Sequence, residues 1–179
     1  MTVTTSPAVA ARATVIGDLV GSRKATDRAI LHARLKAALR RTNAVIPAAT
    51  PLAVTVGDEF QGSYARLGNA LDATVRVYLD LMPEYEVRFG IGWGEVTTLD
   101  GEGIQDGPGW WSARDAIVRV HARQARASTR ALTTEFEATP DQLDPSTVDL
   151  VTASLLLRDQ ALASLSEVSK VILGRLMDN

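Results

Sequence analysis

Two acidic corners interrupt otherwise apolar segments of this chain. Asp18 lies within Val15–Gly21, and Asp58, followed by Glu59, lies within Val54–Tyr64. An ionised carboxylate beside a hydrophobic core is costly unless a cation or a hydrogen-bond donor pairs with it. Two such carboxylates, each next to a glycine, indicate a shared cation bound by oxygen ligands, most simply magnesium together with a phosphate group.

Each carboxylate also has an ordinary structural interpretation. Asp18 could pair with Arg23 near the end of a strand, and Asp58 could simply belong to a tight Gly-Asp turn. Glu59 could bind an arginine instead of a metal ion. Because Asp18 and Asp58 occur in matching contexts, we predict that both are metal ligands, with Glu59 as a third candidate.

Basic and aromatic residues supply candidate contacts to a nucleotide. Arg23 and Lys24 follow the first acidic corner and could bind a triphosphate, although basic residues before a helix are commonly just solvated. Arg114 could reach the same cleft or pair with a neighbouring carboxylate. Trp110 could stack on a base at the start of a helix, and the alternative is burial of Trp110 or Trp111 against the sheet.

Composition excludes several other kinds of site. The chain has 179 residues, of which 46% are hydrophobic, and its formal net charge of -2 provides no overall basic field to attract nucleic acid or a membrane. It contains no cysteine and only two distant histidines, His32 and His121. Disulfides and thiolate ligands are therefore excluded and a histidine zinc site is not expected, which leaves oxygen-ligated metals. No segment reaches the roughly 18 to 20 apolar residues of a membrane span, and no secretory leader is recognisable, so we expect a cytoplasmic protein.

Hydrophobic periodicity and turn residues predict the elements that would position these groups. The order is a buried strand, a helix, a hairpin with Gly57-Asp58 at its tip, a second helix, a strand, a third helix and a short edge strand. This order predicts an α+β fold, a mixed sheet with helices packed on one face. The expected ranges are 13–20, 26–45, 52–56 with 60–65, 67–82, 87–96, 110–126 and 132–137.

The C-terminal part differs in character from the rest of the chain. Pro140–Pro145 is the best linker candidate, and beyond it two apolar-striped helices are expected over 147–165 and 166–177. We therefore predict a disordered tail over 1–12, a main domain over 13–139 and a helical extension over 140–179.

Three segments together resemble class III nucleotide cyclases. Ala13–Ser22 is similar to their first strand, Val54–Phe60 to their Gly-Asp hairpin, and Val87–Val96 to the strand that reads Gly-Ile-His-x-Gly-Glu-Val, with Gly92 in place of the histidine. The same ferredoxin-like palm fold occurs in GGDEF diguanylate cyclases and in nucleic-acid polymerases. The resemblance implies a palm domain with two-metal nucleoside triphosphate chemistry.

Under this resemblance, Asp18 and Asp58 would bind the metal ions. Arg114 would match the arginine of an Asn-x-Ala-x-Arg helix that stabilises the transition state. The asparagine of that helix and a purine-selecting lysine are missing, with Val54 at the lysine position. The backbone after the first carboxylate would approach phosphate, which makes these residues candidates for binding it: Leu19, Val20, Gly21 and Arg23.

The whole chain resembles the SatD family of bacterial proteins. The family's Gly-Asp-Leu-Val-Gly-Ser-Arg, Gly-Asp-Glu-Phe-Gln-Gly and Asp-Gly-Pro-x-Trp-x-Ala-Arg motifs all occur here, the last as Asp106–Arg114. The family usually continues into a helix-turn-helix that reads DNA. This sequence stops at Asn179, after the first helix of such a unit, so we expect a truncated sequence and assign no DNA binding to it.

These observations predict a regulatory protein whose palm domain binds a nucleoside triphosphate and magnesium. If it is active, it would be a nucleotidyl cyclase or transferase. The alternative is a non-catalytic, dimerising scaffold of a DNA-binding transcriptional regulator. Class III sites usually form between two subunits, so the resemblance also implies a homodimer.

Overall fold

The described part of the chain contains one six-stranded mixed sheet. The computed structural model describes residues 10–22, 27–99 and 104–177. The strand order is β2-β3-β1-β4-β5, and β6 pairs with β4 in parallel while the other pairs are antiparallel. The bounds of the strands are β1 Ala10–Leu19, β2 Thr50–Val56, β3 Glu59–Tyr64, β4 Val87–Thr98, β5 Gln105–Asp106 and β6 Thr134–Ala138.

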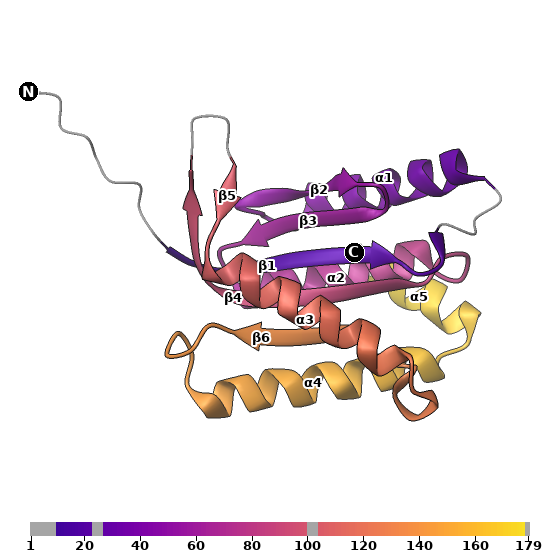
Figure 1. Cartoon of the computed structure of the whole chain (residues 1–179). Coiled ribbons are helices and arrows are strands. Elements are labelled where there is room, and N and C mark those ends of the chain that lie inside the picture. Colours follow the sequence, from indigo (N-terminus) through magenta and orange to yellow (C-terminus); the bar gives the residue numbers. More distant parts are fainter. Residues whose placement is uncertain (1–9, 23–26, 100–103, 178–179) are drawn as a thin grey trace, which may run out of the picture.

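Helices cover both faces of this sheet (Figure 1). Helices α1 (Arg28–Val45) and α2 (Leu67–Leu81) pack behind it, and α3 (Pro108–Gln124) crosses in front of β1, β4 and β6. The predicted mixed sheet is confirmed, but the expectation that the helices share one face is wrong. The reason is that β1 and β4 are central strands with an apolar side chain or a glycine on both faces, so each face needs its own cover.

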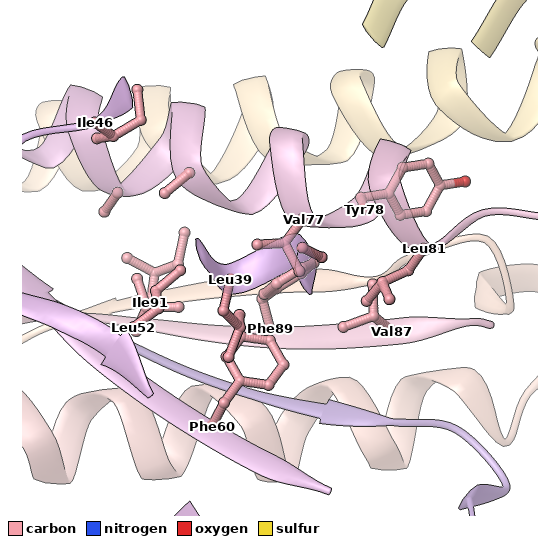
Figure 2. Close-up of a cluster of buried hydrophobic side chains, with 14 of the residues drawn as sticks. Leu39, Ile46, Leu52, Phe60, Val77, Tyr78, Leu81, Val87, Phe89 and Ile91 are labelled. Carbon is pink, nitrogen blue, oxygen red and sulfur yellow. The ribbon is translucent and has the colours of Figure 1, made fainter. Parts of the chain in front are cut away.

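The larger core lies between the sheet and the pair α1 and α2. Phe60 and Phe89 meet edge to face there, with ring centroids 6.1 Å apart. Figure 2 shows the surrounding side chains, which come from both helices and from the strands beneath them. Gly17 makes room for Phe60, because a Cβ built on Gly17 would lie 2.2 Å from the Phe60 ring.

The α3 face is built on glycines of β4. Gly90 and Gly92 lie opposite Ile16 and Thr14 of β1, so all four residues point toward α3. A Cβ on Gly92 would lie 2.1 Å from the carbonyl oxygen of Gly109, so the helix backbone rests directly on the strand. This close approach fixes the position of α3 and of every side chain that it carries toward the sheet.

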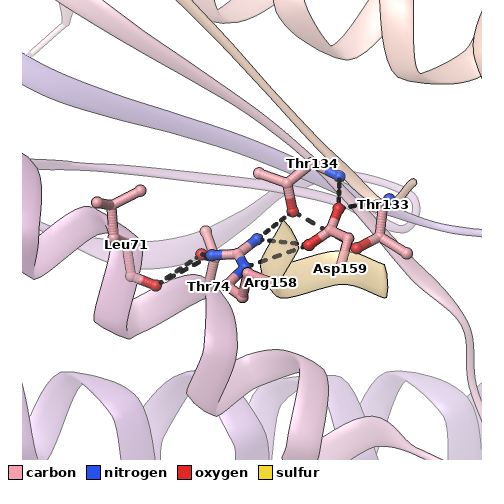
Figure 3. A network of polar contacts seen from close by, with 6 residues as sticks. All are labelled: Leu71, Thr74, Thr133, Thr134, Arg158 and Asp159. Carbon is pink, nitrogen blue, oxygen red and sulfur yellow. Dashed lines mark hydrogen bonds and ion pairs between the residues drawn. The ribbon is translucent and has the colours of Figure 1, made fainter. Parts of the chain in front are cut away.

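The C-terminal helices pack onto the same body. Helix α4 (Pro145–Ser164) places Leu155 and Leu162 in the larger core, and α5 (Glu167–Met177) contacts α2. Asp159 of α4 is buried and accepts the backbone N–H groups of Thr133 and Thr134 at 2.7 and 2.8 Å, as Figure 3 shows. The domain boundary near residue 139 stays a prediction.

Several local expectations are confirmed. Asp27 caps α1 by accepting from the N–H groups of Ala29 and Ile30, and Gly57 turns the β2–β3 hairpin with a φ of 63°. Strand β6 lies at an edge, paired with β4 alone among the described strands.

Residues 10–12, which the sequence analysis assigned to a disordered tail, belong to β1 because the long strand β4 pairs with them. Residues 1–9 lie outside the described part of the chain. No helix in the described ranges has the length and hydropathy needed to cross a membrane.

Candidate functional site

Asp18 lies at the end of β1, directly opposite Arg88 of β4. The Arg88 guanidinium donates from Nε to Oδ1 and from Nη2 to Oδ2 of Asp18, both at 2.9 Å. His121 of α3 approaches the same Oδ2 with its Nε2 at 2.9 Å. The side chains of Asp18 and Arg88 are only 18% and 14% exposed, respectively. This partly buried, two-point pair already neutralises the Asp18 carboxylate.

Asp58 lies in the turn between β2 and β3, at the same end of the sheet. Its Oδ2 accepts a hydrogen bond of 2.5 Å from the hydroxyl of Ser22, which follows β1. Gly21, with a φ of 69°, turns the chain between the strand and this serine. The structure therefore brings the two acidic corners together through Ser22, while Asp18 and Asp58 keep separate partners.

Glu59 begins β3 and pairs with Arg114 of α3. Two hydrogen bonds of 2.7 Å join the guanidinium to the two carboxylate oxygens. The hydrogen bonds that the Arg114 guanidinium donates to Glu59 raise the pKa of Arg114, against a smaller opposing effect of burial. This arrangement matches the interpretation of Glu59 as the partner of an arginine. The carboxylate that pairs with Arg114 belongs to β3 and not to a residue close to Arg114 in the sequence.

The two tryptophans at the start of α3 have different environments. Trp110 is buried against Ile16 and Val96 in the smaller core cluster. Trp111 is 59% exposed, and its indole N–H donates to Asp106 at 2.9 Å. The packing interpretation thus describes Trp110, and Trp111 is the member of the pair whose ring is open to solvent.

The predicted phosphate-binding segment after β1 is mostly engaged in the fold. Leu19 is buried in the larger core, and the N–H of Val20 donates to the Glu86 carbonyl at 2.8 Å. Gly21 is described, but Arg23 lies outside the described residues. The role of this segment in phosphate binding stays a prediction.

A cavity of about 400 Å³ lies beside the Asp18 pair. Arg88 and His121 both line it, and neither was predicted as a site residue. The signals were present: Arg88 is one residue from the start of the third resembling strand, and His121 lies two helical turns beyond Arg114, on the same side of α3. Three of the lining residues can carry positive charge and one is acidic; the full lining is Val20, Glu86, Arg88, His121, Gln124, Ala125 and Arg130.

The residues present do not fit a shared magnesium ion in this arrangement. Both oxygens of Asp18 are held by Arg88, and both oxygens of Glu59 are held by Arg114. Within residues 10–22, 27–99 and 104–177, no three acidic or histidine side chains converge as a metal site would require. The assignment of magnesium to Asp18, Asp58 and Glu59 stays a prediction, and it requires both arginines to move away.

The model of the SatD family matches residues 12–176, nearly the whole chain. The chain belongs to the SatD family. No curated protein matches it.

Solved structures similar to this SatD family chain include nucleotide cyclases. Two structures of a bacterial light-regulated adenylyl cyclase each align over 74% of this chain with a TM-score of 0.55, at 13% and 14% identity. The alignments span 44% of the length of those cyclase chains. A guanylyl cyclase domain of the RhoGC fusion protein from the fungus Blastocladiella emersonii aligns over 61% of this chain and 74% of its own, at 15% identity with a TM-score of 0.48. The likeness to the light-regulated adenylyl cyclase, at 13% and 14% identity, shows a cyclase-like palm fold.

Proposed function

We propose that this SatD family member is a regulatory protein whose palm domain binds the phosphate groups of a nucleoside triphosphate beside Asp18, without two-metal catalysis. The observation that carries the proposal is the two-point pair between Arg88 and Asp18 at the wall of a basic cavity. In this position, where a metal-dependent palm would hold its cation, the chain supplies a guanidinium.

Arg88 has the chemistry to exchange partners. Its planar guanidinium can form the same two parallel hydrogen bonds with a phosphate as with a carboxylate. A triphosphate carries several negative charges and would also meet His121 and Arg130 on the cavity wall. Phosphate therefore competes with Asp18 for Arg88, and the free energy of the existing pair opposes ligand binding.

The competing candidate is the magnesium-dependent enzyme, with Asp18 and Asp58 as ligands and Arg114 at the phosphate. The contact of Asp58 with Ser22 favours it, because the contact holds the second acidic corner near the end of β1. This candidate requires magnesium to displace Arg88 from Asp18. In the magnesium-dependent enzyme, Arg88 would therefore oppose metal binding and Asp18 would promote it.

The two candidates predict opposite effects of the same substitutions. Binding of ATP and GTP, with and without magnesium, would be measured by isothermal titration calorimetry for wild type, Asp18→Asn and Arg88→Ala. Our proposal predicts that Asp18→Asn, which keeps the shape but removes the competing charge, preserves or strengthens binding. Arg88→Ala should weaken it about tenfold or more, the loss of one charge-assisted contact. Arg40→Ala, an exposed arginine of α1 on the other face of the sheet, is the matched control.

Each remaining outcome identifies another function. Magnesium-dependent binding that is lost in Asp18→Asn and in Asp58→Ala would establish the metal-dependent candidate and justify a search for product. Binding of neither nucleotide by any variant would refute both candidates and favour the dimerising scaffold, which sedimentation analysis would then test.

A further inference from the structure

A second basic hollow lies on the face of the sheet opposite α3, between α1, α2 and α5. It has a volume of about 260 Å³. Five cationic side chains line it against one carboxylate: Arg34, Arg41, Arg76, Lys170 and Arg175, with Asp80. We call it the α5 groove. This local excess of positive charge occurs in a chain whose net charge is -2, so it is a feature of the groove and not of the composition.

Carboxylates pair with three of these arginines. Arg41 pairs with Asp80 at 3.0 Å, Arg34 with Glu84 at 3.3 Å and Arg76 with Asp72 at 3.2 Å. In the first two pairs the arginine side chain is about half exposed, and exposed ion pairs of this kind contribute little free energy. A ligand with two or more negative charges can therefore recruit Arg34 and Arg41 without breaking a strong interaction.

Helix α5 lies at the surface of the described part of the chain. It has no buried residue, and its attachments include the partly buried Leu173 against the larger core, a hydrogen bond of 2.5 Å from Arg76 to the carbonyl of Met177, and Lys170 over the ring of Tyr78 at 5.9 Å. The α5 side of the groove contributes Lys170 and Arg175, which face the arginines of α1 and α2. Like charges on opposing walls repel each other, so a bound anion would draw α5 inward.

We infer that the α5 groove binds a small phosphate-bearing anion, pyrophosphate or the phosphate end of a nucleotide, and that this ligand fastens α5 to α1 and α2. The volume lies just below the range of cavities that hold drug-sized ligands, which fits a compact anion. Gly174 keeps the space open, because its nearest neighbour on the groove side is the Cβ of Leu79, 3.8 Å from where its own Cβ would be. The ligand would therefore control the order of α5.

The test uses pyrophosphate, ADP and ATP as probes on the full chain, by calorimetry and by hydrogen exchange of α5. Saturating pyrophosphate, at about 100 times Kd, should slow exchange of α5 amides about 100-fold if opening of α5 releases the ligand. Lys170→Glu should weaken pyrophosphate binding about tenfold or more. The matched control is Lys36→Glu, the same charge reversal at an exposed position of α1 outside the groove.

A second variant separates blocked binding from a damaged helix. Gly174→Leu adds a side chain whose Cβ would lie at ordinary contact distance from Leu79, and it replaces glycine with a better helix former. It should abolish pyrophosphate binding while α5 exchanges no faster than in wild type. Equal pyrophosphate affinity with ADP and ATP would identify the phosphate end as the whole ligand, whereas tighter binding of a nucleotide would extend the ligand to its nucleoside; both support the groove.

The inference would be overturned by any of these results: no binding of pyrophosphate; equal loss of pyrophosphate binding in Lys36→Glu and Lys170→Glu; or loss of binding in Arg88→Ala with full binding in Lys170→Glu. The last result would assign the ligand to the cavity beside Asp18. A short DNA duplex that binds through Lys170 while pyrophosphate has no effect would also overturn it, in favour of nucleic acid. Because Arg88 lies on the other face of the sheet, failure of the α5 groove and failure of the nucleotide site would be distinguished.

Discussion

Removal of the Asp159 carboxylate should be among the most destabilising single changes in this protein. The side chain is completely buried, and it joins α4 to the start of β6 (Figure 3). Asp159→Ala would leave the N–H groups of Thr133 and Thr134 without their acceptor and would deprive Arg158 of its partner at 3.0 Å. The guanidinium is only 20% exposed, so its charge would stay largely desolvated.

The magnitude follows from these losses. Each orphaned buried donor costs about 1 to 3 kcal/mol, and breaking a buried ion pair by removing one partner costs about 3 to 5 kcal/mol in total. Arg158 keeps hydrogen bonds to Thr74 and Thr134, which limits the damage. We therefore expect about 4 kcal/mol, a large part of the roughly 5 to 15 kcal/mol by which a domain is stable.

Urea unfolding followed by circular dichroism at neutral pH would measure this loss. Asp149→Ala is the matched control, because Asp149 is an exposed aspartate of the same helix and should change stability by no more than about 0.5 kcal/mol. The double variant Arg158→Ala with Asp159→Ala should lose less than the sum of the single losses, since the two residues share one network. A loss below about 1 kcal/mol for Asp159→Ala would refute the reasoning that these donors and this charge depend on Asp159.

Two further predictions concern backbone packing and pH. Gly92→Ala should destabilise the protein by about 2 kcal/mol or more, because the new Cβ would meet the Gly109 carbonyl at 2.1 Å. Gly68→Ala, whose new Cβ would have nothing within 4 Å, should instead stabilise the protein by up to about 1 kcal/mol. Thermal unfolding would measure both changes, and equal effects would contradict the packing of α3 on β4. Hydrogen bonds from Ser146 and Thr147 lower the pKa of Asp144 to about 2 from 3.8, so the stability they provide is present above about pH 4 and is lost as the pH falls through 2. Carboxyl-carbon NMR should report that low pKa, and Thr147→Val should raise it toward 3.8; a wild-type value near 3.8 would contradict these contacts.

The elements of this fold could be predicted from the sequence because their causes are local. Asp27 begins a helix since its side chain can reach the first free N–H groups, and Gly57 permits the positive φ of a tight hairpin. The motifs of the SatD and cyclase families then predicted the arrangement of those elements in one palm-like sheet, which the family match and the fold likeness bear out.

The site was predicted less completely, because partners across a sheet are not visible in sequence spacing. Asp18 and Glu59 were recognised as unusual carboxylates, but Arg88 is 70 residues from Asp18 and Arg114 is 55 residues from Glu59. Only the antiparallel register of β1 and β4 places Arg88 opposite Asp18. Likewise, α3 packs on Gly90 and Gly92 of β4, and the sequence of the strand alone does not say which element approaches these glycines.

The sequence by itself therefore determined where most of the helices, strands and turns form and which carboxylates have unusual surroundings. Tertiary structure decided on which face of the sheet α3 lies, and so whether the carboxylates meet cations of the protein or stay open to a metal ion. The physical reason is range: capping, turn formation and periodicity depend on neighbours within a few residues, whereas the pairing of a buried charge depends on whichever group the packed sheet brings within hydrogen-bond distance.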